Sequence, residues 1–341
     1  MGKLQAFYAC VLLGVTPLAA KPLIIAHRGA SGERPEHTLA AYQLAIEQGA
    51  DFIEPDLVPT KDGILVARHE NEISGTTDVA NRPEFAARKA TRTIDGESIT
   101  GWFTEDFTLA ELKSLRARER IPQLRSTAFD GQFQIPTFAE VLALAKANGV
   151  GVYPETKHPS YFAAIGLPLE ARLLTDLKVV GWTRPTDPVF IQSFEVGNLK
   201  RLRKMTRLRL AQLVADGSPP DSPGTPYAAM LTPTGLKAVA KYASGIGAER
   251  KLVVPRGADG KLGGATPLVA DAHAAGLKVH IWTLRAENFF LPTDFKRGSD
   301  PRSPGDMAAE VCAFLKAGVD GLFTDNPGLA VKGQESCVFH P

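Results

Sequence analysis

The chain has 341 residues, of which 44% are hydrophobic and 22% are charged, and its 39 Lys and Arg residues against 37 Asp and Glu residues give a net charge of +2. These values exclude a largely disordered chain and argue against nucleic acid as the partner. No run of about 18 apolar residues follows the N-terminus, so no stable membrane insertion of the main body is expected. The length suits two average domains or one large α/β barrel.

The first 20 residues, MGKLQAFYACVLLGVTPLAA, have the pattern of a secretory signal peptide. Lys3 supplies the positive start, the segment from residue 6 to Ala20 is mainly apolar, and small residues end it. We expect cleavage after Ala20 and a periplasmic or secreted protein whose single domain covers residues 21–341. A first core helix or an uncleaved anchor is the alternative.

Short apolar runs typical of strands alternate with stretches of helical spacing along the rest of the chain. The expected strands cover residues 23–26, 51–58, 150–157, 189–194, 208–214, 251–255, 279–284 and 321–324. The expected helices cover residues 38–48, 137–148, 167–177, 196–205, 234–242, 267–275 and 306–317. This alternation predicts a parallel sheet, and eight units favour a closed TIM (β/α)8 barrel of the α/β class. A doubly wound open sheet is the alternative.

A segment from about residue 71 to residue 135 interrupts the alternation, and it is too long for an ordinary barrel loop. We therefore expect a small inserted subdomain after the second strand, with one capped helix in the segment FTLAELKSLRARER, residues 107–120. Loss of the signal peptide would remove Cys10 and leave Cys312 and Cys337. In an oxidising compartment these two can form a disulfide, and two unpaired thiols are the equal alternative.

Three carboxylates fall at the strand ends where a barrel forms its active site. Glu54 and Asp56 are two residues apart on one expected strand, so both side chains point to the same face. Two buried carboxylates repel each other and lose hydration, and a bound cation removes both penalties. Glu155, on the next strand, adds a third oxygen, and such a set suits one Mg²⁺ or Ca²⁺ ion. A salt-bridged pair is the alternative meaning of Glu-x-Asp.

Two histidines, His27 and His69, follow strand-like runs at the same rim. A His pair beside a carboxylate cluster suits proton transfer near neutral pH. Arg28 and Lys157 add positive charge, and Arg matches the oxygens of a phosphate in a bidentate way. These residue types together predict cleavage of a phosphate ester, with one His activating the nucleophile and the other protonating the leaving oxygen.

Three segments resemble the glycerophosphodiester phosphodiesterase family. They are HRGASGERPEHTLAAYQLAIEQGADFIEPDLVPTKDGILVARHE, YPETKHP and GVDGLFTDNP, and the likeness extends over residues 22–331. PEHT, SGTTDVA and the long insertion look most like the secreted, periplasmic branch of that family. The resemblance implies a TIM barrel with an inserted subdomain, a divalent cation, and hydrolysis of glycerophosphodiesters such as glycerophosphocholine and glycerophosphoethanolamine to sn-glycerol 3-phosphate and an alcohol.

The resemblance also implies roles for individual residues. His27 and His69 match the acid/base histidines, and Glu54, Asp56 and Glu155 match the metal ligands. The matches on the substrate side are Arg28, Lys157, Trp282 and Glu36, with Trp282 also open to interpretation as a core aromatic. Gln192, Phe194 and His280 are further candidates for the pocket wall. Glu70 stands where many members have Asp, which leaves the partner of His69 open.

Two other functions fit the same residues. A phospholipase C or D of the same barrel would form a cyclic phosphate by internal attack, and a non-catalytic periplasmic protein would only bind a phosphate ester. The second is disfavoured because a binding protein has no need of an acid/base pair. The oligomeric state is open.

Overall fold

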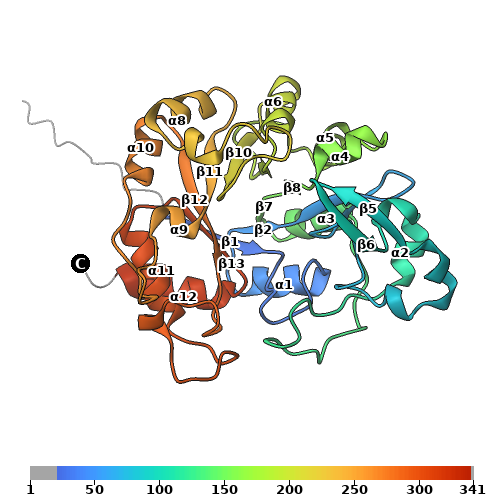
Figure 1. Cartoon of the computed structure of the whole chain (residues 1–341), viewed down its shortest axis with the longest axis horizontal. Coiled ribbons are helices and arrows are strands. Elements are labelled where there is room, and N and C mark those ends of the chain that lie inside the picture. The colour runs from blue at the N-terminus through green and yellow to red at the C-terminus, as the bar shows by residue number, and fades with distance from the viewer. Residues whose placement is uncertain (1–20, 339–341) are drawn as a thin grey trace, which may run out of the picture.

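The computed structural model describes residues 21–338, so the expected signal peptide lies outside the described residues. Its centre is a barrel of parallel strands with helices around the outside (Figure 1). The strands at the start of the chain are β1 (Leu23–His27), β2 (Phe52–Glu54), β3 (Asp56–Pro59), β7 (Gly151–Val152) and β8 (Glu155–Thr156). The remaining barrel strands are β9 (Phe190–Ser193), β10 (Arg209–Val214), β11 (Gly245–Glu249), β12 (Lys278–Leu284) and β13 (Gly321–Thr324).

The barrel closes because β1 pairs with both β13 and β2. β2 and β3 form one barrel strand that is interrupted at Pro55, and β7 and β8 form the next, interrupted at Tyr153 and Pro154. Proline has no backbone N–H to donate, which accounts for a break in the ladder at each point. The predicted eight-stranded barrel is confirmed, and the doubly wound alternative is wrong.

Helices follow most of the barrel strands and pack on the outside. They are α1 (Leu39–Glu47), α3 (Phe138–Ala147), α4 (Pro159–Ala164), α5 (Glu170–Val179), α6 (Val196–Met205), α7 (Tyr227–Met230), α8 (Pro233–Val239), α9 (Arg250–Val253), α10 (Leu268–Ala274), α11 (Met307–Lys316) and α12 (Pro327–Val338). A side-chain hydrogen bond to Thr38 begins α1. A capping box of Thr137 and Glu140 begins α3. These local signals explain why the starts of both helices were predictable. None of the helices within residues 21–338 has the length and apolar character needed to cross a bilayer.

One predicted barrel strand is wrong. Residues 251–255 contain most of α9, and the strand is β11 just before it. The sequence of β11, GIGAE, has two glycines and low strand propensity, so its pattern did not predict a strand. A Cβ atom on Gly245 would lie 2.8 Å from the carbonyl oxygen of Lys278 on β12. Close approach of the two backbones therefore requires glycine there.

The insertion lies beside the barrel and contains more structure than predicted. A hairpin of β5 (Ala90–Ile94) and β6 (Glu97–Gly101) occupies a stretch that was expected to have no strand. The expected helix over residues 107–120 is only α2 (Leu109–Ser114), because Ala117 is drawn into a bridge with Thr77 and the chain there is extended. Strand β4 (Leu65–Ala67) runs antiparallel to β3 at the edge, and short 3₁₀ turns complete the loops: η1 (Val79–Asn81), η2 (Pro83–Arg88), η3 (Thr104–Asp106) and η4 (Thr293–Phe295).

The inside of the barrel is filled mainly by aromatic side chains. Tyr153 stacks on Phe190, with ring centroids 5.0 Å apart, and meets Phe323 edge to face. His280 belongs to this layer, since it is buried and its Nδ1 lies 2.8 Å from the Tyr153 hydroxyl. The contacts of His280 therefore place it in the barrel core and not in the wall of a pocket.

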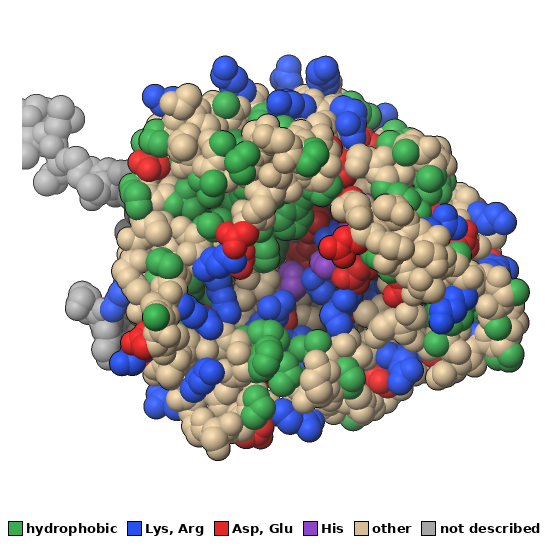
Figure 2. All heavy atoms as spheres, in the orientation of Figure 1, with side chains coloured by type: hydrophobic (Ala, Val, Ile, Leu, Met, Phe, Trp, Pro, Cys, Tyr) green, Lys and Arg blue, Asp and Glu red, His purple; other side chains and the backbone are tan. Residues whose placement is uncertain are grey.

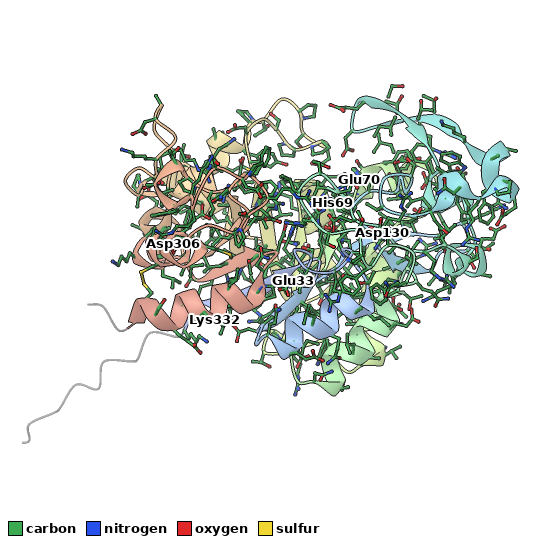
Figure 3. The ribbon with its side chains drawn as sticks, turned by 90° about the horizontal axis from the view of Figure 1, so that it is seen from below. Glu33, His69, Glu70, Asp130, Asp306 and Lys332 are labelled. Carbon is green, nitrogen blue, oxygen red and sulfur yellow. A yellow bond between two sulfur atoms is a disulfide. The ribbon has the colours of Figure 1, made fainter. Side chains whose placement is uncertain are left out.

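The C-terminal helix α12 was not predicted, because two glycines weaken the helical pattern of its sequence. It packs against α11, and a disulfide between Cys312 and Cys337 joins the two helices (Figure 3). The structure therefore selects the disulfide over two unpaired thiols.

Candidate active site

Charged side chains gather in a hollow of the surface at the carboxyl ends of the barrel strands. Figure 2 shows histidines at the floor of this hollow, with acidic and basic side chains beside them. His27 ends β1, Glu54 ends β2, and Glu155 begins β8. The barrel brings together residues that are more than 120 positions apart in the chain, as the sequence analysis expected.

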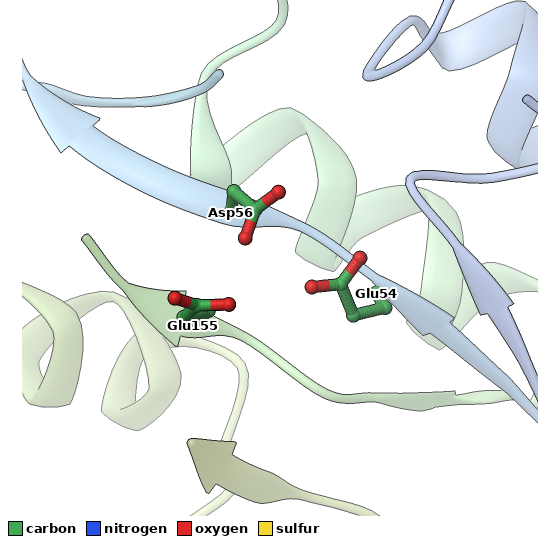
Figure 4. Close-up of side chains that lie close together, drawn as sticks. All are labelled: Glu54, Asp56 and Glu155. Atoms are coloured by element: carbon green, nitrogen blue, oxygen red, sulfur yellow. The ribbon is translucent and has the colours of Figure 1, made fainter. Parts of the chain in front are cut away.

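The three predicted metal ligands form one cluster. Glu54, Asp56 and Glu155 each offer an oxygen, and these oxygens all lie within 4.8 Å of one another. Figure 4 shows their carboxylates turned toward each other between β2, β3 and β8. The parallel register aligns Asp56 with Glu155, which accounts for their approach across the two strands.

The cluster has more negative charge than its protein partners balance. Burial, with the charges of Asp56 and Glu155, raises the pKa of Glu54 well above its usual range. Burial also raises the pKa of Glu155 to about 8. Burial opposes ionisation of Asp56 as well, but Lys157, His69 and His37 hold its pKa well below the ordinary value. Three buried carboxylates cannot all ionise at low cost without a cation.

The contacts of the cluster leave one buried oxygen without a partner. The Oδ1 atom of Asp56 is buried and has no hydrogen-bond partner within the described residues. Glu54 accepts hydrogen bonds from Gln192 Nε2 at 3.0 Å and from the backbone N–H of Arg28 at 2.9 Å. An all-oxygen donor set with an unsatisfied buried oxygen fits a hard divalent cation, so the residues present fit the predicted ion.

His27 is oriented by a buried carboxylate that the sequence analysis did not assign. Its Nδ1 lies 2.6 Å from Asp325 Oδ1. Burial, assisted by Arg28, lowers the pKa of His27 to about 4, although Asp325 opposes the shift. The ring is therefore neutral at pH 7. An ionised carboxylate can only accept, so Nδ1 has the hydrogen and Nε2 has the free lone pair.

Asp325 is itself held by two arginines. Arg125 Nη2 donates to it at 2.6 Å and Arg285 Nε at 2.7 Å. Burial opposes ionisation, but Arg285, Arg125 and His27 hold the pKa of Asp325 well below its usual range. Asp325 directly follows β13 in the motif TDNP, so its strand-end position was the signal that could have identified it. Arg125 comes from the insertion, and nothing in the sequence connects it to His27.

His69 is also oriented by a carboxylate. Its Nδ1 is hydrogen-bonded to Glu70, which lies beside it (Figure 3). Its Nε2 lies 3.2 Å from Lys157 Nζ. Burial and the charges of Arg28 and Lys157 lower the pKa of His69 to about 3, so this ring is also neutral at pH 7. Glu70 thus fills the partner position that the sequence left open.

The predicted cations lie between the histidines and the carboxylates. Lys157 Nζ is 2.9 Å from Glu155 Oε1. Arg28 has a φ of 60°, a left-handed conformation that is uncommon outside glycine, and its Nε has no hydrogen-bond partner within the described part of the chain. This buried donor faces the cluster, since it is 3.3 Å from Asp56 Oδ2. Such strain at a site is typical of functional positions.

Glu36 lies behind the cations. It accepts from Arg28 Nη1 at 3.0 Å and from Arg120 Nε at 2.7 Å, and Arg120 also donates to Glu70 at 2.7 Å. These contacts position the two arginines, and the role of Glu36 toward substrate stays a prediction. Arg120 belongs to the insertion, so the insertion supports both histidine sites through Arg120 and Arg125.

Trp282 lies at the rim, whereas His37 is buried beneath the cluster's carboxylates. Trp282 is half-buried on β12, where its Nε1 donates to the carbonyl oxygen of Gly247 at 2.9 Å and its ring meets Phe194 edge to face. His37, which the sequence analysis did not assign, donates through Nε2 to Asp56 at 2.9 Å, and its Nδ1 lies 2.7 Å from the Tyr42 hydroxyl. His37 therefore fixes the orientation of one carboxylate of the cluster.

Comparison with known proteins points to one family. The model of the glycerophosphoryl diester phosphodiesterase family matches residues 27–329. The glycerophosphodiester phosphodiesterase GDPD6 of Arabidopsis thaliana is 38% identical over 333 residues, which cover 93% of this chain and 87% of that protein. A glycerophosphodiester phosphodiesterase of Haemophilus influenzae is 32% identical, with 93% and 91% covered.

Solved structures share the fold. A glycerophosphodiester phosphodiesterase from Agrobacterium tumefaciens has a TM-score of 0.59 at 21% identity, with 91% of this chain and 99% of that chain covered. An Oleispira antarctica phosphodiesterase, solved in complex with the product sn-glycerol-3-phosphate, has a TM-score of 0.61 at 21% identity, with 92% and 97% covered.

Proposed function

This chain belongs to the glycerophosphoryl diester phosphodiesterase family and is a glycerophosphodiester phosphodiesterase, and on that premise we propose a metal-dependent hydrolysis with His27 and His69 as the acid/base pair. The products are sn-glycerol 3-phosphate and an alcohol, and the substrates include glycerophosphocholine and glycerophosphoethanolamine. The observation that supports the proposal best is the position of two carboxylate-oriented histidines beside a buried three-carboxylate cluster.

Arg28 and Lys157 bind the phosphate in this proposal. Lys157 is buried and the Arg28 side chain is 11% exposed, and the buried Nε donor of Arg28 has no hydrogen-bond partner among the described residues. A phosphate oxygen can accept from it, and charge-assisted hydrogen bonds of this kind are about twice as strong as neutral ones.

The two histidines move the protons. His27 Nε2 and His69 Nε2 each have a lone pair, because the Nδ1 atoms are held by Asp325 and Glu70. One ring takes a proton from the attacking water as the water oxygen bonds to phosphorus, and the other, which has taken up a proton at Nε2 from solvent before the reaction, gives it to the leaving alkoxide oxygen as the P–O bond to the alcohol breaks. The negative charge of the bound diester favours the protonated form of the ring that acts as the acid.

Glu54, Asp56 and Glu155 would hold one Mg²⁺ or Ca²⁺ ion, which supplies charge neutralisation at the phosphate when bound. The chain's own part in this is to keep the three carboxylates in place through His37, Gln192 and the backbone of Arg28.

The first experiment measures release of sn-glycerol 3-phosphate with glycerol-3-phosphate dehydrogenase as the coupling enzyme. The purified protein with Mg²⁺ or Ca²⁺ should hydrolyse glycerophosphocholine, lose activity in excess chelator, and regain it when the ion is restored. Full activity in excess chelator would contradict metal dependence. Phosphorus NMR follows the same reaction, and an accumulating cyclic phosphate would favour the phospholipase-like alternative over direct hydrolysis.

The second experiment tests the histidines. H27A and H69A should each lose activity by at least about 100-fold, whereas H273A should keep it, because His273 lies on α10 and is hydrogen-bonded to Asp320 away from the cluster. A substrate whose leaving group is p-nitrophenolate needs no acid. It should therefore restore activity to one of the two variants and not to the other, and rescue of neither or both would contradict the division into acid and base.

We also propose that the protein is exported to the periplasm or secreted. The disulfide between Cys312 and Cys337 supports an oxidising compartment. N-terminal sequencing of the mature protein from the producing cell should begin at Lys21. An intact Met1 on cytoplasmic material would contradict the proposal.

A further inference from the structure

A cavity opens directly from the cluster. It has a volume of about 290 Å³ and begins at Glu155 and Lys157. Its walls come from the turn between β5 and β6, from the loops after β9 and β10, and from α7. Phe194, one of its lining residues, meets Trp282 edge to face, so the cavity lies next to the rim that Trp282 occupies.

The cavity is lined by carboxylates with few balancing cations. Asp95, Glu195 and Asp216 join Glu155 in the wall. Among the described residues that line the cavity, Lys157 is the only Lys or Arg. Asp216 is exposed and paired with Lys251 Nζ at 2.6 Å, whereas Asp95 is paired with a histidine, His158, at 2.7 Å. The wall beyond Lys157 therefore presents net negative charge.

Glu195 is the carboxylate least well balanced. It is 1% exposed, and its hydrogen bonds come from a neutral residue, Ser160, through the backbone N–H at 3.1 Å and the hydroxyl at 2.8 Å. Burial, with the nearby charges of Asp221 and Asp95, raises the pKa of Glu195 to about 7, although Ser160 opposes the shift. A cation in the cavity would remove this penalty.

Aromatic rings complete the wall. Phe194 and Tyr227 both line the cavity, with ring centroids 6.2 Å apart and planes inclined at 66°. Burial and the surrounding carboxylates raise the pKa of Tyr227 above its ordinary value, so its hydroxyl stays neutral. Aromatic rings together with carboxylates are the groups that recognise ammonium and quaternary ammonium ions.

We propose that this cavity is the subsite for the alcohol half of the substrate and that it selects a cationic alcohol, with the ammonium group held by Glu195, Asp216 and the rings of Phe194 and Tyr227. The inference rests on the proposed function, because it places the phosphate at Lys157 where the cavity begins. The proposed subsite assigns a substrate class to the enzyme, namely diesters of an alcohol with a positively charged ammonium group. Diesters of neutral or anionic alcohols lack that positive charge.

The test compares two substrates of the same shape. Glycerophosphocholine and the diester of 3,3-dimethyl-1-butanol differ only in a charged nitrogen that is replaced by carbon. We expect kcat/KM of the wild-type enzyme to be about tenfold higher for glycerophosphocholine, as a cation–aromatic and cation–carboxylate contact predicts. A wild-type ratio near one would overturn the subsite while leaving the proposed function intact. If neither substrate is hydrolysed, the proposed function itself fails.

Variants locate the effect. E195Q and D216N should each lower the ratio of kcat/KM values by about three- to fivefold, and the exposed control E84Q should leave it unchanged, because Glu84 on η2 does not line the cavity. D216N keeps the test valid if E195Q disturbs α4 through Ser160, since Asp216 is exposed. A ratio that stays at the wild-type value in both variants, or a loss equal for the two substrates, would overturn the proposal.

Discussion

Replacement of Asp325 by Asn should damage catalysis through His27. The carboxylate is buried and accepts hydrogen bonds from His27, Arg125 and Arg285. Asn keeps the size of the side chain but removes the charge that stabilises an imidazolium as His27 takes a proton. It also places an amide, which can donate, opposite two guanidinium groups that can only donate.

The size of the effect follows from the geometry. At an effective dielectric constant of about 20, an imidazolium and a carboxylate about 4 Å apart interact by about 4 kcal/mol. Arg125 and Arg285 share the carboxylate and offset part of its charge, so we expect a loss of about 3 kcal/mol, or about 100-fold in kcat. Asp325 has no direct role at the substrate, so KM should change by less than about threefold.

The assay is steady-state hydrolysis of glycerophosphocholine by wild type, D325N and a matched control, D320N. Asp320 precedes β13, whereas Asp325 follows it. Asp320 likewise accepts from a histidine, His273 at 2.7 Å, and from Lys278 at 2.7 Å, but at the opposite end of the barrel. D320N should therefore keep wild-type kcat.

Non-additivity provides the sharpest check. If Asp325 acts through His27, D325N should cause little further loss in an H27A background. Equal losses with and without His27, or a D325N enzyme with wild-type kcat, would refute the reasoning.

Three further predictions concern stability, measured by urea unfolding. G29A should lower the unfolding free energy by about 3 kcal/mol, because Gly29 has a φ of 86° and a Cβ atom would lie 2.6 Å from the backbone of Ala41; a loss under about 1 kcal/mol would contradict this. Burial lowers the pKa of His280 to about 4, whereas the unfolded value is about 6.5. Between these two values the unfolded chain binds the proton and the folded chain does not, so the free energy of unfolding decreases as the pH is lowered. H280F should reduce the loss between pH 7 and pH 5 by about 2 kcal/mol, and an unchanged pH slope would count against it. Replacing Cys312 and Cys337, which are 25 residues apart, by Ala should cost about 3 kcal/mol, and an unchanged midpoint would contradict a stabilising disulfide.

Local patterns in the sequence were enough to predict the barrel and the centre of its site. The alternation of short apolar runs with helical stretches gave seven of the eight barrel strands, because strand and helix periodicity depend on neighbouring residues. Spacing of two on one strand placed Glu54 and Asp56 on the same face, and the strand-end rule brought Glu155 and His27 to the same rim.

Only the tertiary structure decided which residues orient the histidines and hold the carboxylates of the site. Arg120 and Arg125 reach Glu70 and Asp325 from an insertion with no barrel periodicity, over 50 and 200 positions of sequence. Strand β11 depends on glycine where the backbone of β12 approaches closely, a contact between elements that no local propensity encodes. The neutral histidines have the same origin, because their pKa values depend on burial and on charges that only folding brings within reach.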